Sequence, residues 1–204
     1  MNKDLYSRPP KPKTLSVTRR GGAPEKALPE LPQIVEVDRY SECHVTPPDV
    51  AARMVDYLGP VGDFLTLEPS AGTGNLIAAL YESGHSRHEL TAIERHYALC
   101  KEIRKRFSGS QYIDVIQQCF LEYAQTAQGG IEFPRILMNP PFREVRKHMA
   151  AALSLLGNGG HDGCTLVALV PITYQNDEAE TLEELDSETF SAAKVFTKII
   201  RIER

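Results

Sequence analysis

The segment Asp63-Phe-Leu-Thr-Leu-Glu-Pro-Ser-Ala-Gly-Thr-Gly-Asn75 decides the fold of this chain. It begins as an apolar strand that ends at Glu68, and it continues through a Gly-x-Gly turn into the helix-forming residues 75–81. Glycines at positions 72 and 74 let the backbone turn tightly and approach a ligand closely. This strand–turn–helix context predicts a nucleotide-binding site, which a Gly-x-Gly sequence alone would not.

Acidic residues near the turn indicate the kind of ligand. The third glycine of a dinucleotide fingerprint is missing, and Glu68 argues against a pyrophosphate and for a cationic or amino-bearing group. A second strand, Leu90-Thr-Ala-Ile-Glu94, follows about 20 residues later. Because a carboxylate at the end of that strand holds a ribose diol in this architecture, we predict Glu94 as a ribose ligand rather than a solvated charge.

The remaining pattern alternates strands with helices, which predicts an α/β sandwich with a mostly parallel sheet. We expect strands at 63–68, 90–94, 112–116, 135–139 and 165–170, and helices at 46–58 (with Thr46 as the cap), 75–83, 96–107 and 143–156. We also expect a short acidic helix at 178–186 and a final antiparallel strand at 194–202, on the edge of the sheet.

Four candidate site residues fall at or just past the carboxyl ends of expected strands: Glu68, Glu94, Cys119 and Asn139. Ligands of open α/β sheets bind beyond these ends. We therefore expect the four residues to converge on one crevice, although they lie far apart in the sequence.

The stretch Asn139-Pro140-Pro141-Phe142 follows the apolar residues 135–138 and has an unusual chemical surface. The two prolines have no N–H and a fixed φ, so they cannot continue a strand ladder, but their carbonyls can accept hydrogen bonds. Asn139 adds a further acceptor, and Phe142 adds a flat apolar face. The stretch suits a planar group that carries an NH2, although a plain Pro-Pro turn is the alternative.

Four motifs together resemble one enzyme family. Glu68-Pro-Ser-Ala-Gly-Thr-Gly74 resembles the first motif of class I S-adenosylmethionine-dependent methyltransferases, and Ile136-Leu-Met-Asn-Pro-Pro-Phe142 resembles the signature of amino-methyltransferases that act on DNA adenine. Thr46-Pro-Pro-Asp-Val50 resembles their upstream motif in the γ-type order, and Ser187-Glu-Thr-Phe190 resembles their late motif. The resemblance covers roughly residues 40–204 and extends to small stand-alone methyltransferases of phage and prophage. It implies a Rossmann-like class I methyltransferase sandwich.

The resemblance also implies S-adenosylmethionine as the cofactor. Glu68 and the loop 70–75 would bind its methionine portion, with Thr46 at the carboxylate, and Glu94 would hold its ribose. The full set of expected cofactor-binding residues is Thr46, Glu68, Pro69, Ser70, Ala71, Gly72, Gly74, Asn75, Glu94, Arg95, Cys119, Phe120 and Asn139. The expected catalytic residues are Asn139, Pro140, Pro141 and Phe142, with Phe142 and Phe190 stacking on the target base.

Two departures from the family pattern stand out. Where the family usually has an acid that reads the cofactor's adenine amine, this chain has Cys119, a weak acceptor, after Gln118. Cofactor affinity would suffer unless Gln118 substitutes for the acid, which leaves room for a weak or inactive enzyme. In addition, the chain reaches Arg204 without a recognition domain, so either specificity is low, a partner subunit supplies it, or the tail and short loops read the target.

The charge is distributed unevenly. Residues 1–33 hold seven Lys or Arg, three acids and six prolines, so we expect a disordered basic tail, either a solvated leader or an arm on a polyanion. Residues 34–204, the expected catalytic domain, hold 16 bases and 24 acids, seven of them within 177–188. Two basic groups favour nucleic acid nonetheless: Lys101, Arg104, Lys105 and Arg106 on one helix, and Arg143, Arg146 and Lys147 after the catalytic stretch.

The composition argues against a membrane protein, a secreted protein and a metal-binding protein. No apolar run approaches the roughly 18–20 residues of a membrane helix, and the N-terminus lacks the pattern of a signal peptide. The cysteines at 43, 100, 119 and 164 are scattered, which predicts reduced thiols in a cytoplasmic protein, and no metal-ligand spacing is present.

We therefore expect a methyltransferase acting on the 6-amino group of adenine in DNA, with the base flipped or unpaired. RNA bases and protein glutamine amides are alternative substrates for the same Asn-Pro-Pro-aromatic chemistry. A third possibility is a catalytically silent subunit that binds the cofactor and completes a partner enzyme. The intact stretch Asn139–Phe142 argues against the silent subunit.

Overall fold

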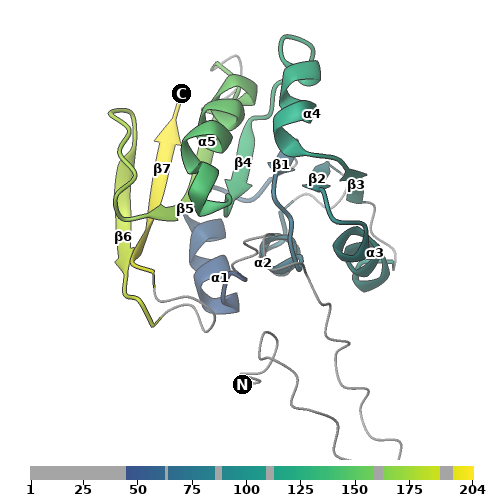
Figure 1. The fold of residues 1–204 in the computed structure, drawn as a ribbon, viewed down its shortest axis with the longest axis horizontal. Coiled ribbons are helices and arrows are strands. Elements are labelled where there is room, and N and C mark those ends of the chain that lie inside the picture. Colours follow the sequence, from purple (N-terminus) through teal and green to yellow (C-terminus); the bar gives the residue numbers. More distant parts are fainter. Residues whose placement is uncertain (1–44, 63, 86–88, 109–112, 159–162, 189–194) are drawn as a thin grey trace, which may run out of the picture. The chain divides into compact units, whose positions relative to one another are not determined.

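A computed structural model describes residues 45–62, 64–85, 89–108, 113–158, 163–188 and 195–204. The elements follow in the order α1 (Pro48–Asp56), β1 (Thr66–Glu68), α2 (Asn75–Ser83), β2 (Leu90–Glu94), α3 (Tyr97–Arg106), β3 (Ile113–Gln117), α4 (Phe120–Ala127), β4 (Arg135–Met138), the 3₁₀ turn η1 (Phe142–Glu144), α5 (Val145–Leu155), β5 (Thr165–Pro171), β6 (Glu180–Leu185) and β7 (Thr197–Glu203) (Figure 1). The expected tail 1–33 and Phe190 lie outside the described residues.

The strands form one seven-stranded sheet in the order β3-β2-β1-β4-β5-β7-β6. The five strands β1, β2, β3, β4 and β5 are parallel to one another, and β7 runs antiparallel to β5. This arrangement confirms the mostly parallel sandwich with an antiparallel late strand. β7 is not the outermost strand, however, because β6 pairs with its far side. Figure 1 shows β6 as the edge of the sheet on the left.

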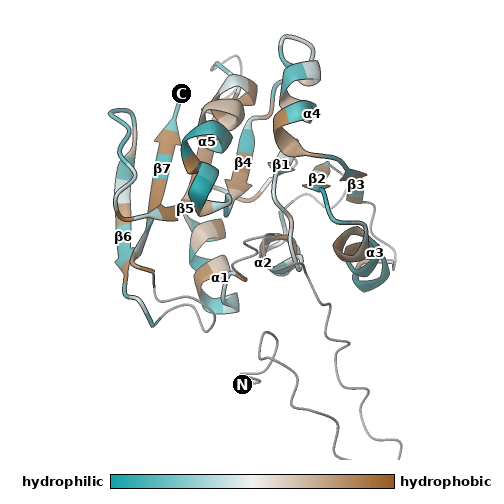
Figure 2. Cartoon of the chain, in the orientation of Figure 1, coloured by the Kyte–Doolittle hydropathy of each residue, from teal (hydrophilic) through white to brown (hydrophobic). Residues whose placement is uncertain are grey.

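Apolar side chains divide between the two faces of the sheet. On β5, Val167 and Leu169 join a cluster with α1, α2 and α3, whereas Leu166, Ala168 and Val170 join a second cluster with α4 and α5. A strand buried on both faces has to be largely apolar, and β5 is apolar from Leu166 to Val170. Figure 2 shows the same distribution, with the hydrophobic colour along β4, β5 and β7 and hydrophilic residues on the outer sides of the helices.

The expected acidic helix at 178–186 is wrong, because this segment forms strand β6. Glutamate favours a helix locally, but pairing with a basic neighbouring strand overrides that preference. Glu180 lies opposite Arg201 in the register, and Arg201 Nη2 donates to Glu180 Oε2 at 2.7 Å. Leu182 and Leu185 meanwhile pack against the core. Helix α4 was not anticipated from the sequence.

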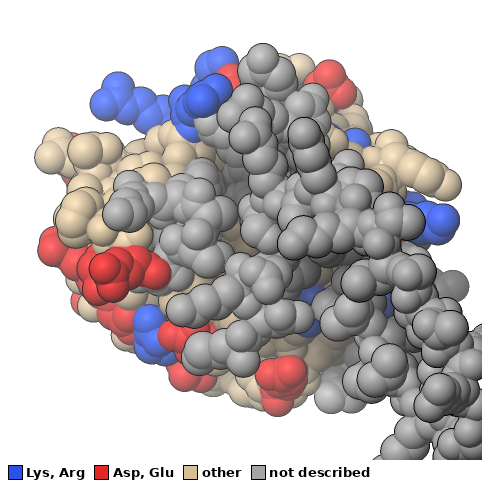
Figure 3. Space-filling model, turned by 60° about the horizontal axis from the view of Figure 1, so that its bottom comes forward, with Lys and Arg blue, Asp and Glu red and all other residues tan. Residues whose placement is uncertain are grey.

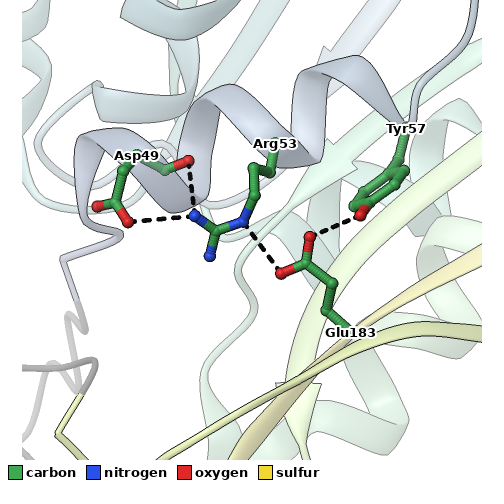
Figure 4. A network of polar contacts seen from close by, with 4 residues as sticks. All are labelled: Asp49, Arg53, Tyr57 and Glu183. Atoms are coloured by element: carbon green, nitrogen blue, oxygen red, sulfur yellow. Dashed lines mark hydrogen bonds and ion pairs between the residues drawn. The ribbon is translucent and has the colours of Figure 1, made fainter.

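Helix α1 is tied to β6 by a network of side chains (Figure 4). Arg53 Nε donates to Glu183 Oε2 at 3.0 Å, and the Tyr57 hydroxyl donates to Glu183 Oε1 at 2.6 Å. Arg53 Nη1 also donates to Asp49 Oδ2 at 3.2 Å. Residues 53 and 57 share one face of the helix because they are four positions apart. The network holds the helix that follows Thr46 against the antiparallel side of the sheet.

The turn that sequence analysis identified contains two glycines with positive φ, 53° at Gly72 and 79° at Gly74. Gly74 is the residue before α2, and a Cβ built on it would lie 3.1 Å from Phe107 Cε2. Both the backbone conformation and the neighbouring ring therefore require glycine at position 74. Gly129 has a similar φ of 77°, but a Cβ there would meet nothing within 4 Å.

We predict that Gly74→Ala destabilises the protein more than Gly129→Ala does. Each substitution should lose about 1–2 kcal/mol of unfolding free energy from the left-handed backbone, and Gly74→Ala should lose more because Phe107 must move. The entropy change of the unfolded chain is the same in both variants, so it cancels in the comparison. Urea unfolding of the two variants measures the difference, and equal losses would contradict the close packing against Phe107.

Candidate active site

The candidate site lies where the sheet order reverses. β1 has β2 on one side and β4 on the other, which makes this the topological switch point where ligands of open α/β sheets bind. A cavity of about 240 Å³ opens there at the carboxyl ends of β1 to β4. Since a single water needs only about 10–15 Å³ of such space, the cavity is large enough for an organic ligand.

Most of the predicted cofactor-binding residues line this cavity. They are Thr46, Pro69, Ser70, Ala71, Gly72, Asn75, Glu94, Arg95, Cys119, Phe120 and Asn139. Pro141 of the predicted catalytic stretch lines it too, whereas Glu68, Gly74, Pro140 and Phe142 do not. The expected convergence of distant segments on one crevice is therefore found for all but Glu68 of its four residues.

The Glu94 carboxylate connects the glycine turn to the end of β2. Its Oε2 accepts a hydrogen bond from Gly72 N–H at 2.9 Å, and its Oε1 accepts one from His96 N–H at 2.8 Å. Ala71 N–H also donates to the Ile93 carbonyl at 3.0 Å. Each carboxylate oxygen has a second lone pair, so Glu94 can accept from a ligand hydroxyl while it holds the turn.

Glu68 ends β1 as predicted, but it does not line the cavity. It is fully buried behind the turn, where Oε1 accepts from Ser70 N–H at 3.1 Å. Among the described residues, Oε2 has no hydrogen-bond partner. Burial raises the pKa of Glu68 to about 8, and the charge of Glu94 adds to the rise, whereas the Ser70 N–H opposes it. This placement favours an indirect role for Glu68 through the turn, and direct contact with a ligand stays a prediction.

Thr46 joins two motifs that lie far apart in the sequence. Its hydroxyl Oγ1 accepts from Asn139 Nδ2 at 3.0 Å, and its carbonyl accepts from Asn75 Nδ2 at 2.8 Å. The expected capping role is therefore wrong, since the cap of α1 is Pro47 and no side chain caps the helix. The contact turns the Asn139 carboxamide so that its nitrogen faces Thr46 and its oxygen Oδ1 points away from it.

The proline pair ends strand β4 as the sequence predicts. β4 stops at Met138, and Pro140 is buried while Asn139 is partly exposed at the strand end. Phe142 begins the turn η1, in which Glu144 N–H donates to the Pro141 carbonyl at 3.1 Å. The stretch thus brings Asn139 and Pro141 to the cavity directly after the last residue of β4.

Three residues at the end of β3 form another side of the cavity. Gln118 N–H donates to the Glu94 carbonyl at 3.1 Å, and Cys119, a free thiol, precedes α4. Phe120 is 3% exposed. Gln118 also lines the cavity, so the substitute acceptor considered from the sequence is present at this position.

His148 lines the cavity although no sequence motif predicts it. It comes from α5, lines the cavity, and packs its ring against Phe120 with the centroids 5.7 Å apart. Burial lowers the pKa of His148 below its usual value, while the charge of Glu144 acts in the opposite direction. One sequence feature could have identified His148: it is a polar residue within the apolar stripe of the predicted helix 143–156. The other buried positions of that stripe are Met149, Ala152 and Leu155. His96, Arg143 and Glu144 also line the cavity.

The surface around the site is divided by charge. Arg143, Arg146 and Lys147 are exposed directly after the predicted catalytic stretch, and Lys147 pairs with Glu144 at 2.8 Å. Figure 3, which brings the bottom of Figure 1 forward, shows basic side chains gathered at the upper left and acidic ones along the left and lower edges. A polyanion would therefore meet favourable charge on only part of this face.

The described residues contain neither a membrane-spanning helix nor a cluster of metal-binding side chains. No helix within those residues is long and apolar enough to cross a membrane. Nor do three or more His, Cys, Asp or Glu side chains there come close enough together to hold a metal ion.

No family model matches the sequence, and no curated protein matches it. The fold, however, is similar to those of solved methyltransferases. An Escherichia coli protein assigned as a methyltransferase matches with a TM-score of 0.57 and 18% identity, over 76% of this chain and 84% of that chain. The 23S rRNA methyltransferase ErmE matches with a TM-score of 0.62 and 20% identity, over 76% of this chain and 67% of that chain.

A third solved structure comes from Vibrio vulnificus. This Vibrio vulnificus protein is assigned as a modification subunit of a type I restriction enzyme, and it matches with a TM-score of 0.67 and 14% identity, over 79% of this chain. The match covers 44% of that protein, so the chain spans less than half its length. At these identities the matches show a shared fold, and they confirm the Rossmann-like class I methyltransferase sandwich.

The buried Glu68 generates a prediction about stability and pH. Its folded pKa of about 8 lies above the unfolded value of 4.5, so between these values the folded protein holds a proton that the unfolded chain has released. The unfolding free energy should therefore fall as pH rises through this window, by up to about 1.4 kcal/mol per pH unit, and level off above it.

Glu68→Gln removes the titrating group and keeps an oxygen that can accept from Ser70 N–H. Urea unfolding of both proteins at several pH values between 5 and 9 gives a difference curve in which other titrating groups cancel. The variant should gain stability relative to the native protein as pH rises. Two parallel curves would show that Glu68 is ionised in the folded protein at neutral pH.

Proposed function

We propose that this protein is an S-adenosylmethionine-dependent methyltransferase that modifies the 6-amino group of adenine in DNA. One observation carries the proposal: the Asn139 carboxamide is oriented by Thr46 at the end of β4, beside a cavity bounded by the glycine turn. The fold it shares with methyltransferases supports this assignment, and so does the order of the motifs along the chain.

The residues around the cavity fit the proposed cofactor. The turn with Gly72 allows close approach of a ligand to the backbone, and Glu94 offers carboxylate oxygens to a ribose diol. Ile93, Leu99 and Phe120 give the cavity apolar surface that a purine ring can cover. S-adenosylmethionine, when bound, supplies a methyl group activated by a sulfonium.

The catalytic stretch would act on the amine that receives the methyl group. Asn139 Oδ1 and the Pro140 carbonyl would accept its two hydrogens, which draws the nitrogen lone pair out of conjugation with the purine ring. The positive charge that develops on nitrogen then meets dipoles that are already in place, so little reorganisation is needed. One amine proton leaves to solvent once the nitrogen carries the methyl group. Holding the amine in line with the methyl group adds the proximity effect.

The target base has to leave its helix to reach this site, which costs a few kcal/mol for a paired base. Phe142 follows the prolines and would stack on the base, and the exposed Arg143, Arg146 and Lys147 would contact phosphates. RNA is the second candidate substrate, because the fold is shared with a 23S rRNA methyltransferase. The acidic composition of residues 34–204 also disfavours long contacts with duplex DNA.

Transfer of labelled methyl from S-adenosylmethionine to unmethylated duplex DNA, single-stranded DNA and RNA tests the proposal. We expect methyladenine in DNA, identified by the mass of the released nucleosides. Asn139→Ala should lower the rate by about 10²–10³-fold, because it removes one acceptor of the developing charge.

Each other outcome points to a specific alternative. If methyladenine forms in RNA alone, the proposed chemistry is retained and the substrate is RNA instead of DNA. Transfer to none of the nucleic acids, despite binding of the cofactor, would contradict the proposal and favour a protein amide or a silent partner subunit.

The contact between Thr46 and Asn139 generates a separate prediction. Thr46→Val keeps the shape of the side chain, and it keeps the backbone carbonyl that accepts a hydrogen bond from Asn75 Nδ2. It removes the hydroxyl that accepts a hydrogen bond from Asn139 Nδ2. We expect kcat to fall at least about tenfold, because a lost hydrogen bond of about 1.4 kcal/mol in the transition state costs that factor. Thr46→Ser keeps the hydroxyl and should lose much less. Equal rates for the two variants would show that Thr46 does not position Asn139.

A further inference from the structure

The basic helix α3 contacts the glycine turn through its last residue, Arg106. Arg106 Nη1 donates to the Thr73 carbonyl at 3.0 Å and to Asn75 Oδ1 at 3.1 Å. Thr73 is the middle residue of the Gly-x-Gly turn and Asn75 is the first residue of α2, and both line the cavity, whereas Arg106 does not. From the sequence, Arg106 is one of four basic residues expected to favour nucleic acid. Its contacts in the structure are with the turn instead.

The end of α3 is packed against this turn, so the Arg106 guanidinium has a defined position. Ile103 is fully buried, and its carbonyl accepts from Phe107 N–H at 3.0 Å. The Phe107 ring packs against Gly74, and Arg106 Cζ lies 5.3 Å from the centroid of that ring, within the range of a cation–π contact. Figure 1 shows α2 and α3 side by side on the same side of the sheet.

The Asn75 carboxamide lies between two partners of opposite kind. Its Oδ1 accepts from Arg106, and its Nδ2 donates to the Thr46 carbonyl at 2.8 Å. A guanidinium has only donors, and a backbone carbonyl can only accept. Reversing the carboxamide would therefore lose both hydrogen bonds and would place its nitrogen against N–H groups and its oxygen against an oxygen. Arg106 and Thr46 together thus fix one orientation of Asn75.

Asn75 in turn fixes Thr46. Thr46 lies outside the helices and strands, directly before Pro47 and Pro48, which have no N–H to donate. Its carbonyl accepts from Asn75 Nδ2 and its hydroxyl accepts from Asn139 Nδ2 at 3.0 Å. Because carbonyl and hydroxyl belong to one residue, a displacement of the first moves the second. The hydrogen bonds thus connect the end of α3 with the amide at the end of β4.

We propose that Arg106 is a positioning residue for the methyl transfer: it orients the Asn75 carboxamide and, through Thr46, places the Asn139 amide. The inference rests on the proposed function, since it concerns the amide that would accept from the target amine. Arg106 lies outside the cavity lining, so it acts only through the residues that it holds. Direct contact with substrate phosphates is the competing role for this side chain.

Steady-state kinetics on the nucleic acid that the native protein methylates test the inference. Arg106→Met keeps an unbranched stem beside Phe107 and removes the donor, so kcat should fall about fivefold. Arg106→Lys keeps a charged donor and should lose less. Lys105→Met is the matched control, because it removes the same charge from an exposed position of the same helix. Its kcat should stay above that of Arg106→Met.

A double-mutant cycle with Thr46→Val identifies the route of the effect. Thr46→Val lacks the hydroxyl through which Asn139 is placed, so adding Arg106→Met to it should change kcat by no more than about twofold. An equal loss in both backgrounds would mean that Arg106 acts on the turn alone, through Thr73, and would overturn the inference.

The outcomes separate this inference from the proposed function. If the native protein transfers no methyl group to nucleic acid, the proposed function is wrong and the role of Arg106 falls with it. If the native protein is active and Arg106→Met raises only KM for the nucleic acid, Arg106 contacts the substrate and only this inference is overturned.

Thermal unfolding shows whether each variant is folded. If Arg106→Met is not, Asn75→Asp breaks the next hydrogen bond of the series: it keeps the acceptor of Arg106 and removes the donor to the Thr46 carbonyl. An unchanged kcat of folded Asn75→Asp would equally overturn the inference.

Discussion

Thr46 is the point on which the candidate site depends. Its hydroxyl accepts a hydrogen bond from Asn139 Nδ2 at the end of β4. Its carbonyl accepts one from Asn75 Nδ2 at the start of α2. The position of the Asn139 amide relative to the glycine turn is therefore set by a residue outside the sheet. Helix α1 follows Thr46 directly, and its contacts with Glu183 hold it against β6. A strand late in the sequence thus supports the geometry of a motif near residue 46.

Two acidic residues at neighbouring strand ends have different roles because their surroundings differ. Glu94 receives two backbone N–H groups and borders the cavity, so its carboxylate can be shared between the turn and a ligand. Glu68 is fully buried, receives a single N–H, and has a pKa raised to about 8. The negative charge of Glu94 contributes to that rise. One acid is suited to ligand contact, and the other is suited to supporting the loop in its neutral form.

The antiparallel side of the sheet explains the acidic segment of the chain. Glutamates of β6 lie opposite basic residues of β7. Glu183 of β6 also accepts hydrogen bonds from Arg53 and from Tyr57 at the C-cap of α1. Part of the negative charge that counts against nucleic acid in the composition is thus used within the fold. The exposed basic residues after the predicted catalytic stretch lie on other elements, α5 and the turn η1 before it, where they are open to a substrate.

The sequence by itself determined the sandwich, the glycine turn and the end of β4, because strand–helix alternation, positive-φ glycines and prolines act through local backbone physics. It also predicted that Glu94, Cys119 and Asn139 meet at one cavity, since parallel strands align their carboxyl ends. Only the tertiary structure decided that residues 180–185 form a strand. It also decided that Thr46 accepts a hydrogen bond from Asn139 instead of capping α1, and that His148 borders the cavity. Those three outcomes depend on partners far away in the sequence, and local propensity and periodicity contain no information about such partners.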